Sequence, residues 1–148
     1  MTSPEGSSVT FRRPPATLRQ RSITNFAQLL ERDVAKGRAF DTLITGDAEL
    51  RRLNSNFRGK DYATDVLSFP SGAGAGLGDI AISLGRARAQ AREFGHPIEH
   101  EVQILMLHGV LHLMGYDHES DTGAMARAEK RWRGKLGLPN GLIERVRA

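Results

Sequence analysis

Apolar positions recur along this chain with two periods, and the change of period separates predicted helices from predicted strands. From Arg21 the apolar residues return every three or four positions, which predicts an amphipathic helix that Gly37 ends. A similar pattern from Leu84 to Phe94 stops at Gly95, and Pro97 suits the first turn of the helix that follows. Glycine and proline thus mark the ends of these predicted helices.

Three more helical features complete this reading. The helix after Pro97 carries apolar residues up to Gly115. A last helix is expected from about Asp121 to Leu136. Asp47 is a candidate N-cap for a short helix through Leu50, Leu53 and Asn54.

Short runs rich in β-branched and aromatic residues predict strands. They are "AFDTLIT" (39–45), "TDVLSFP" (64–70) and "LGDIAIS" (77–83). Residues 1–17 are expected to be irregular, apart from a short extended piece around Val9–Phe11. Because strands come early and helices late, the pattern favours an α+β fold over a doubly wound sheet. We expect one domain over residues 1–148, with a mixed sheet of three or four strands and about five helices.

The glycine-rich stretch "SGAGAGLG" lies between the second and third of these strands. Its glycines do not match the spacing G-x-G-x-x-G, and the stretch leads into a strand instead of a helix N-terminus. We therefore interpret it as a flexible hairpin loop and not as a nucleotide-binding loop.

Composition narrows the possible classes of protein. The 148 residues include no cysteine, which excludes disulfides and thiolate metal sites. Neither a signal peptide nor a membrane span is apparent, so a cytoplasmic enzyme or binding domain is expected. The net charge is +4, with arginine in excess over lysine. This charge fits either a solvated basic surface or a surface that meets phosphates.

Three of the five histidines fall in the stretch "HGVLHLMGYDH". His108 and His112 are four residues apart, so they lie about 40° apart around a helix and can face one metal ion. Gly115 can end the helix and turn the chain back, which would bring His118 round as a third ligand. Three histidines leave the fourth position of a zinc ion open, as in catalytic sites. The spacing therefore predicts a zinc site at the end of the long helix.

The same spacing occurs in metzincin proteases, but there a glutamate follows the first histidine and acts as the general base. This chain has Gly109 at that position, which suggests close approach of backbone or substrate, or simple packing.

Other polar residues are weaker candidates for chemistry. Glu101 is expected near the helix N-terminus, His100 at the surface and Asp117 in a turn or beside the ligands; Asp79 remains a possible base.

The whole constellation resembles the YbeY rRNA maturation factors, a family of zinc-dependent endoribonucleases. "HGVLHLMGYDH" is similar to the family signature H-G-x-L-H-L-x-G-Y-D-H. "LNSNFRGKDYATDVLSFP" and "LGDIAIS" resemble the two upstream blocks of the family, in the same order, and "MARAE" fits the Met and Glu of its final helix. The similarity is nearly continuous from about Ile44 to Leu136. Ala63 stands where the family often has proline.

This resemblance implies one zinc ion on His108, His112 and His118. It also implies that Arg58 is a functional residue, and a guanidinium there could hold a scissile phosphate. Arg58 and His108 are thus the expected catalytic residues.

The implied activity is cleavage of single-stranded RNA, in maturation of the 3′ end of small-subunit (16S) rRNA and in ribosome quality control. The implied partners are rRNA, the small ribosomal subunit and its assembly proteins, with no membrane. A metalloprotease-like hydrolase and a ribosome-binding factor with a structural zinc remain as alternatives. The residues leave open whether water or the ribose 2′-hydroxyl is the nucleophile.

Overall fold

A computed structural model describes residues 6–59, 64–71, 76–116 and 122–138 of the chain. Strands and helices follow one another in the order β1 (Ser8–Phe11), α1 (Gln20–Asp33), β2 (Phe40–Thr45), α2 (Asp47–Arg58), β3 (Val66–Pro70), β4 (Gly78–Ser83), α3 (Leu84–Phe94), α4 (Ile98–Leu113) and α5 (Ala124–Leu136). Within the described ranges, no helix is both long and apolar enough to cross a membrane.

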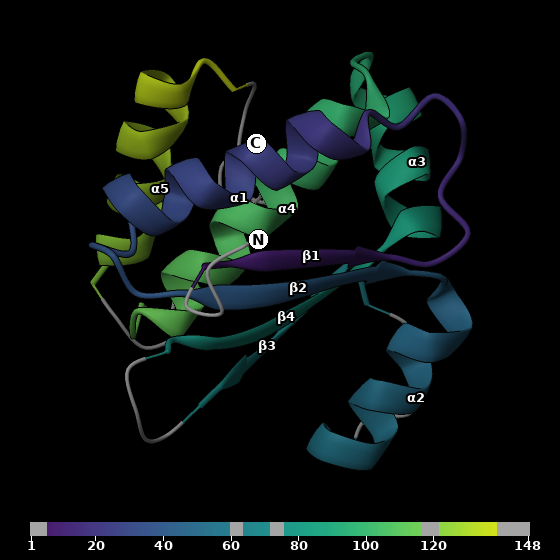
Figure 1. Cartoon of the computed structure of the whole chain (residues 1–148), viewed down its shortest axis with the longest axis horizontal. Coiled ribbons are helices and arrows are strands. Elements are labelled where there is room, and N and C mark those ends of the chain that lie inside the picture. Colours follow the sequence, from purple (N-terminus) through teal and green to yellow (C-terminus); the bar gives the residue numbers. More distant parts are fainter. Residues whose placement is uncertain (1–5, 60–63, 72–75, 117–121, 139–148) are drawn as a thin grey trace.

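The four strands form one mixed sheet in the order β1-β2-β4-β3 (Figure 1). β2 pairs in parallel with β1 on one side and with β4 on the other, while β3 runs antiparallel to β4 at the edge. Pro70 pairs with Gly78 where the β3–β4 connection begins and ends, so the glycine-rich stretch does join a hairpin. The expected α+β class, the mixed sheet and the set of about five helices are confirmed.

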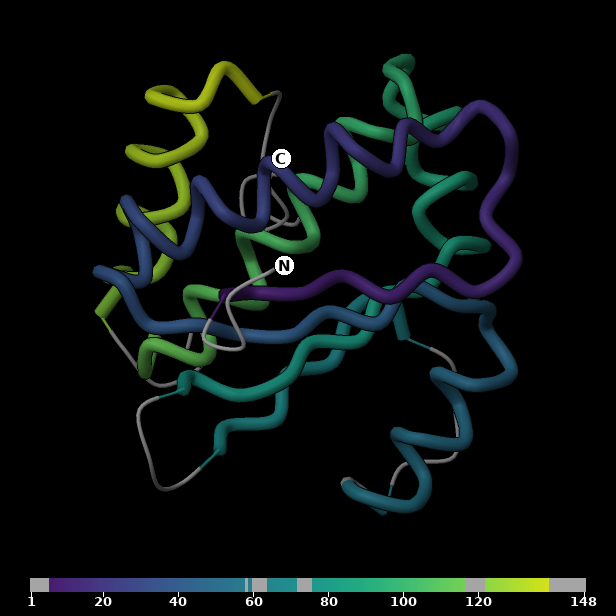
Figure 2. The backbone as a smooth tube through the Cα atoms, viewed as in Figure 1, coloured from purple at the N-terminus to yellow at the C-terminus, as the bar shows by residue number. Residues whose placement is uncertain are grey.

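The helices are distributed unequally over the two faces of the sheet. α1 and α4 lie across one face, with α3 and α5 at its two ends, and α2 lies against the other face (Figure 1). Figure 2 shows the chain passing from β1 over this helical face through α1 before it returns to β2. α4 is enclosed by the sheet and the neighbouring helices, and residues 101–111 are all buried. This explains why its sequence is apolar almost all round.

Three details differ from the sequence-based expectations. Gly46, not Asp47, is the N-cap of α2, and the Asp47 carboxylate instead accepts a hydrogen bond from the Ser83 hydroxyl at the start of α3. α2 also runs further than expected, to Arg58. Pro97 is the N-cap of α4 and so lies just before its first turn. The short extended piece expected near the N-terminus is β1, an edge strand of the sheet.

Candidate functional site

α4 approaches the sheet most closely at Gly109. A Cβ atom at this position would lie 3.0 Å from both Cδ1 and Cγ2 of Ile80 in β4. The Gly109 carbonyl accepts a hydrogen bond from the Ser68 hydroxyl of β3 at 3.2 Å. Close packing on the sheet therefore explains the glycine. A glutamate at this position, as in the metzincin motif, would point into the sheet and not toward a substrate.

The two helical histidines flank Gly109 along α4. His108 is buried and His112 is half-buried, one turn further on. Their ring centroids are 5.0 Å apart and their planes meet at 65°. The structure thus confirms that the helical spacing brings these two imidazoles together.

A buried carboxylate supports the first histidine. Glu129 of α5 is 2% exposed, and its Oε2 lies 2.8 Å from Nδ1 of His108. A carboxylate at this atom keeps the ring proton on Nδ1 and leaves the lone pair of Nε2 available. Carboxylate–histidine pairs of this kind orient the imidazole and raise its basicity in metal sites. The pair is a satisfied polar contact in the core, of a kind that also supports histidine ligands in metal sites.

The role of Glu129 was missed by the sequence reasoning, although "MARAE" was noted as part of the resemblance. A signal was present, because Glu129 shares the buried side of α5 with Met125 and Ala128. A charged residue on the apolar stripe of a helix requires a partner in the core. The sequence did not reveal that this partner is His108, 21 positions earlier.

α4 ends in a turn at Gly115, as the sequence predicted. Gly115 adopts a left-handed conformation with φ of 100°. The amide of Gly115 donates to the His112 carbonyl at 3.0 Å, and the amide of Tyr116 donates to the Leu111 carbonyl at 3.1 Å. These two bonds form a Schellman motif, which ends the helix and reverses the chain.

His118, the expected third ligand, lies outside the described residues, as does Asp117. Within the ranges that are described, no three His, Asp or Glu side chains are placed to hold one metal ion. His108 and His112 nevertheless fit a zinc ion by their chemistry. Both are imidazoles one helical turn apart, and the proton on the first is held away from the binding nitrogen by Glu129.

Arg58 is the last residue of α2, and Gly59 follows it in a left-handed conformation. The side chain of Arg58 is outside the described part of the structure. Because α2 and α4 lie on opposite faces of the sheet (Figure 1), the described backbone does not bring Arg58 beside the histidines. Its role stays a prediction.

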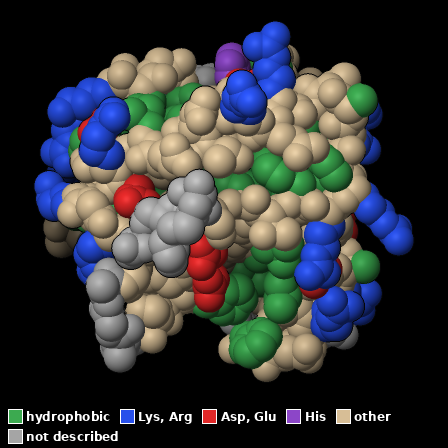
Figure 3. All heavy atoms as spheres, in the orientation of Figure 1, with side chains coloured by type: hydrophobic (Ala, Val, Ile, Leu, Met, Phe, Trp, Pro, Cys, Tyr) green, Lys and Arg blue, Asp and Glu red, His purple; other side chains and the backbone are tan. Residues whose placement is uncertain are grey.

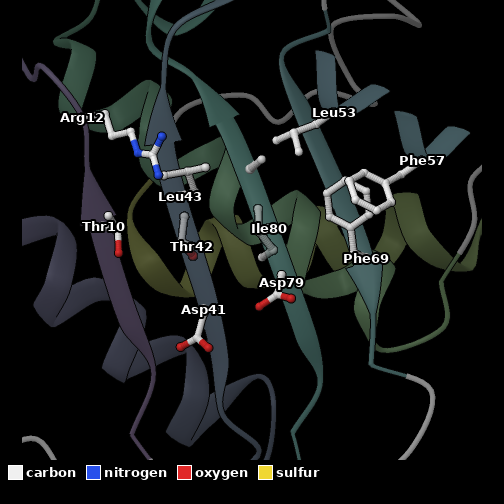
Figure 4. A pocket seen from close by; sticks show the side chains of 11 residues that line it. Thr10, Arg12, Asp41, Thr42, Leu43, Leu53, Phe57, Phe69, Asp79 and Ile80 are labelled. Atoms are coloured by element: carbon white, nitrogen blue, oxygen red, sulfur yellow. The ribbon is translucent and has the colours of Figure 1, made fainter. Parts of the chain in front are cut away.

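Asp79 does not belong to the histidine site. Its neighbour Ile80 faces α4, so the alternation of side chains along β4 turns Asp79 to the other face. There Asp79 and Asp41 occupy paired positions of neighbouring strands and point to the same side (Figure 4). Burial, followed by the charge of Asp41, raises the pKa of Asp79 above its ordinary value. The possible role of Asp79 as a base for the histidine site is therefore wrong.

The two aspartates line an open hollow of about 460 Å³ on this face of the sheet. Phe57 of α2 and Phe69 of β3 form its apolar wall, with ring centroids 5.6 Å apart (Figure 4). The hollow is separated from His108 by the sheet itself. It is a second concave surface and not an entrance to the histidine site.

Glu101 lies in the first turn of α4, as expected from its favourable position near the helix N-terminus. It is fully buried, and its Oε1 lies 3.0 Å from Nε2 of His96. His100 is half-buried, so it lies only partly at the surface, and its ring centroid is 6.2 Å from that of His96. This second histidine–carboxylate pair lies at the opposite end of α4 from His112, so it has a structural role.

Fold and site together define an α+β domain whose central helix carries two histidines supported by a carboxylate from the next helix. A family model described as "Endoribonuclease YbeY" matches residues 13–137. The endoribonuclease YbeY of Solibacter usitatus is 76% identical over 148 residues, covering all of both chains. That of Nautilia profundicola is 51% identical over 107 residues, covering 71% of this chain and 77% of the relative. The chain belongs to the YbeY endoribonuclease family.

The fold also has a solved counterpart. The solution structure of TM1509 from Thermotoga maritima superposes with a TM-score of 0.61 at 27% identity, covering 88% of this chain and 90% of that one. The similarity therefore extends over nearly the whole domain.

Proposed function

We propose that this protein is a zinc-dependent endoribonuclease that cleaves single-stranded RNA. The observation that carries the proposal is the contact of 2.8 Å between His108 Nδ1 and Glu129, in a chain that belongs to a family of endoribonucleases. The proposed zinc ligands are His108, His112 and His118. Nuclease activity is supported by the family, and dependence on zinc by the chemistry of the histidine pair.

Each residue of the site then has a definite task. A zinc ion, when bound, would supply Lewis-acid stabilisation of the negative charge that develops at the phosphate. Glu129 keeps the proton on Nδ1 of His108 and fixes the direction of its ring. His112 provides a second nitrogen from the next turn. Arg58 is proposed to contact a phosphate of the RNA through its bidentate guanidinium.

The contact between Gly109 and Ile80 argues against the peptidase alternative. In the metzincin motif the general base is the residue after the first histidine. Here a side chain at that position would crowd Ile80 of β4. A peptidase would require a base from elsewhere, and the structure excludes Asp79 from that role.

We further propose that the substrate in the cell is small-subunit rRNA, cut during maturation of its 3′ end and in ribosome quality control. The small ribosomal subunit and its assembly proteins would be the partners, in the cytoplasm. Family membership and the net charge of +4 support this setting. Contacts between the phosphates of RNA and a basic protein surface do not depend on the RNA sequence, and they weaken as the salt concentration rises.

The proposal is tested by comparing cleavage of single-stranded and duplex RNA by the zinc-loaded protein, the chelated protein and His112→Ala. We expect cleavage of the single strand by the zinc-loaded protein alone. His112→Ala should lose most of its zinc while the fold survives, because this side chain is half-buried at the end of α4. Metal analysis and circular dichroism check both points.

Three outcomes separate the alternatives. RNA binding without turnover, at full zinc content, would indicate a structural zinc. Peptide cleavage without RNA cleavage would indicate a protease. The chemistry of the new RNA ends identifies the nucleophile, because attack by the 2′-hydroxyl leaves a cyclic phosphate and attack by water does not.

A further inference from the structure

The outer side of α5 carries only cations among its charged side chains. Its exposed charged residues are Arg127, Lys130, Arg131 and Lys135. The single acidic residue of the helix, Glu129, is turned inward to His108. Figure 3 shows Lys and Arg side chains at several places on one face, among them the side where Figure 1 draws α5 and the end of α1. We call these four residues the α5 basic face.

The α5 basic face is not explained by stabilisation of the helix itself. Arg127 and Arg131, and again Arg131 and Lys135, are like charges four residues apart, a spacing that destabilises a helix. Cations favour the last turn of a helix, but Arg127 lies near its beginning. Among the described residues, none of the four forms an ion pair with an acidic side chain, and Arg127 donates to the Thr122 carbonyl at 3.1 Å. A bound anion would relieve this repulsion.

An aromatic ring lies among these cations. Trp132 is half-buried, with the Lys135 amine 5.0 Å and the Arg131 guanidinium 6.0 Å from its ring. Cations interleaved with an aromatic ring suit single-stranded RNA, whose phosphates bind the charges and whose bases can stack.

We propose that the α5 basic face binds the backbone of the single-stranded RNA substrate outside the catalytic site. This inference rests on the proposed function. The inner side of the same helix touches His108 through Glu129, so the basic face lies about one helix diameter, roughly 10 Å, from the site.

A nucleic acid fits this face better than a protein does. The centre of a protein interface is depleted in charge and rich in aromatic and apolar residues. The large hydrophobic side chains that are exposed among the described residues are Phe57 in α2 and Phe94 in α3, and neither belongs to α5. The face therefore offers phosphate contacts around one half-buried ring, Trp132, in place of an exposed apolar centre.

α3 provides a matched control. It exposes Arg88 and Arg92 on its outer side, four residues apart. Figure 1 places α3 and α5 at opposite ends of the helical layer. Removing two charges from either helix changes the net charge equally, and only the position of the loss differs.

The test compares Lys130→Gln/Arg131→Gln with Arg88→Gln/Arg92→Gln. Affinity for a labelled single-stranded RNA is measured by anisotropy across a series of salt concentrations. Loss of two phosphate contacts should reduce the slope of log K against log salt by about 1.4, and should weaken binding roughly tenfold at about 0.15 M salt. The α3 pair should stay close to wild type. In steady-state cleavage, the loss in the α5 pair should appear in KM and not in kcat.

Trp132 supplies an independent measurement, because it is the only tryptophan of the chain. Its fluorescence in the wild-type protein should change on addition of RNA, with the same midpoint as the anisotropy.

The outcomes keep this inference distinct from the proposed function. If wild type cleaves RNA but the α5 pair binds it as tightly as wild type, or if both pairs lose affinity equally, the α5 assignment is overturned and the nuclease activity stands. If Lys130→Gln/Arg131→Gln binds RNA as tightly as wild type, an acidic protein would become the better candidate ligand of the α5 basic face. If wild type neither binds nor cleaves RNA, the proposed function fails and the assignment falls with it.

Discussion

Replacing Glu129 with glutamine separates support of His108, the proposed zinc ligand, from packing of the core. The side chains of Glu129 and glutamine have nearly the same size, so the core at this position is preserved. The amide oxygen can still accept from Nδ1 of His108, but it carries no charge, and charge-assisted hydrogen bonds are about twice as strong as neutral ones. The imidazole is then less basic and less firmly oriented.

The expected effect follows from this geometry. Loss of such a partner lowers metal affinity by about tenfold to a hundredfold, or about 1.4–2.7 kcal/mol. We expect the upper part of this range, because Glu129 is 2% and His108 7% exposed and water cannot replace the contact. A competition titration against a chromophoric zinc chelator measures the affinity, and thermal unfolding of the metal-free protein measures the fold.

Glu101→Gln is the matched control. Glu101 is also buried and also contacts a histidine at 3.0 Å, but at the other end of α4. It should lower the stability of the metal-free protein and leave zinc affinity unchanged. Equal zinc affinity in Glu129→Gln and wild type would refute the role given to Glu129. An equal loss in both variants would show that the effect is only on the fold.

Three further predictions follow from single residues. Gly109→Ala should lower the free energy of unfolding by up to about 2 kcal/mol. Crowding against Ile80 costs about 1–3 kcal/mol, and the higher helix propensity of alanine returns about 1 kcal/mol. Urea denaturation measures the change, and an unchanged free energy of unfolding would contradict the prediction. The pKa of Asp79 is raised in the folded protein, so protonation of this carboxylate stabilises the fold. This stabilisation is complete below the ordinary pKa of 3.8 and is lost as pH rises through the raised pKa. Asp79→Asn should therefore unfold at higher urea than wild type at about pH 7 but not at about pH 3; equal midpoints at both would reject this. Arg58→Ala should keep its zinc and cleave RNA about tenfold to a hundredfold more slowly in kcat, with partial recovery in Arg58→Lys. If Arg58→Ala changed only KM, Arg58 would contact the RNA backbone and not the scissile phosphate.

Local signals in the sequence were sufficient for most of the elements. Hydrophobic periodicity located α1, and Gly95 marked the end of α3, because glycine can take the left-handed conformation that ends a helix. The helical spacing of His108 and His112 was enough to predict that their rings meet. These features depend on residues within one or two turns of each other, which is the range over which sequence patterns are informative.

Features that join distant segments could not be read in the same way. The position of β4 between β2 and β3 depends on how the whole sheet assembles. The placement of Asp79 on the face opposite α4 requires knowing which side of β4 packs on Gly109. Likewise, Asp47 looked like an N-cap, but its carboxylate accepts a hydrogen bond from Ser83 at the end of β4. Tertiary contacts decided each of these cases over local preference.

The buried position of α4 explains why the carboxylate beside His108 comes from Glu129 of α5. It also explains why Gly109 stands where a metzincin peptidase has its glutamate base. A helix enclosed on all sides can carry an imidazole only if another element satisfies its polar nitrogen, since an unpaired polar group in the core costs about 1–3 kcal/mol. Glu129 supplies that partner from α5, which is why the carboxylate at this site comes from a different helix. The side of α4 where a metzincin would carry its glutamate is closed by the contact with Ile80. A peptidase and this protein can therefore share the spacing of their histidines and still differ in chemistry. The difference lies in which helix provides the carboxylate and in whether that carboxylate faces a substrate or a histidine.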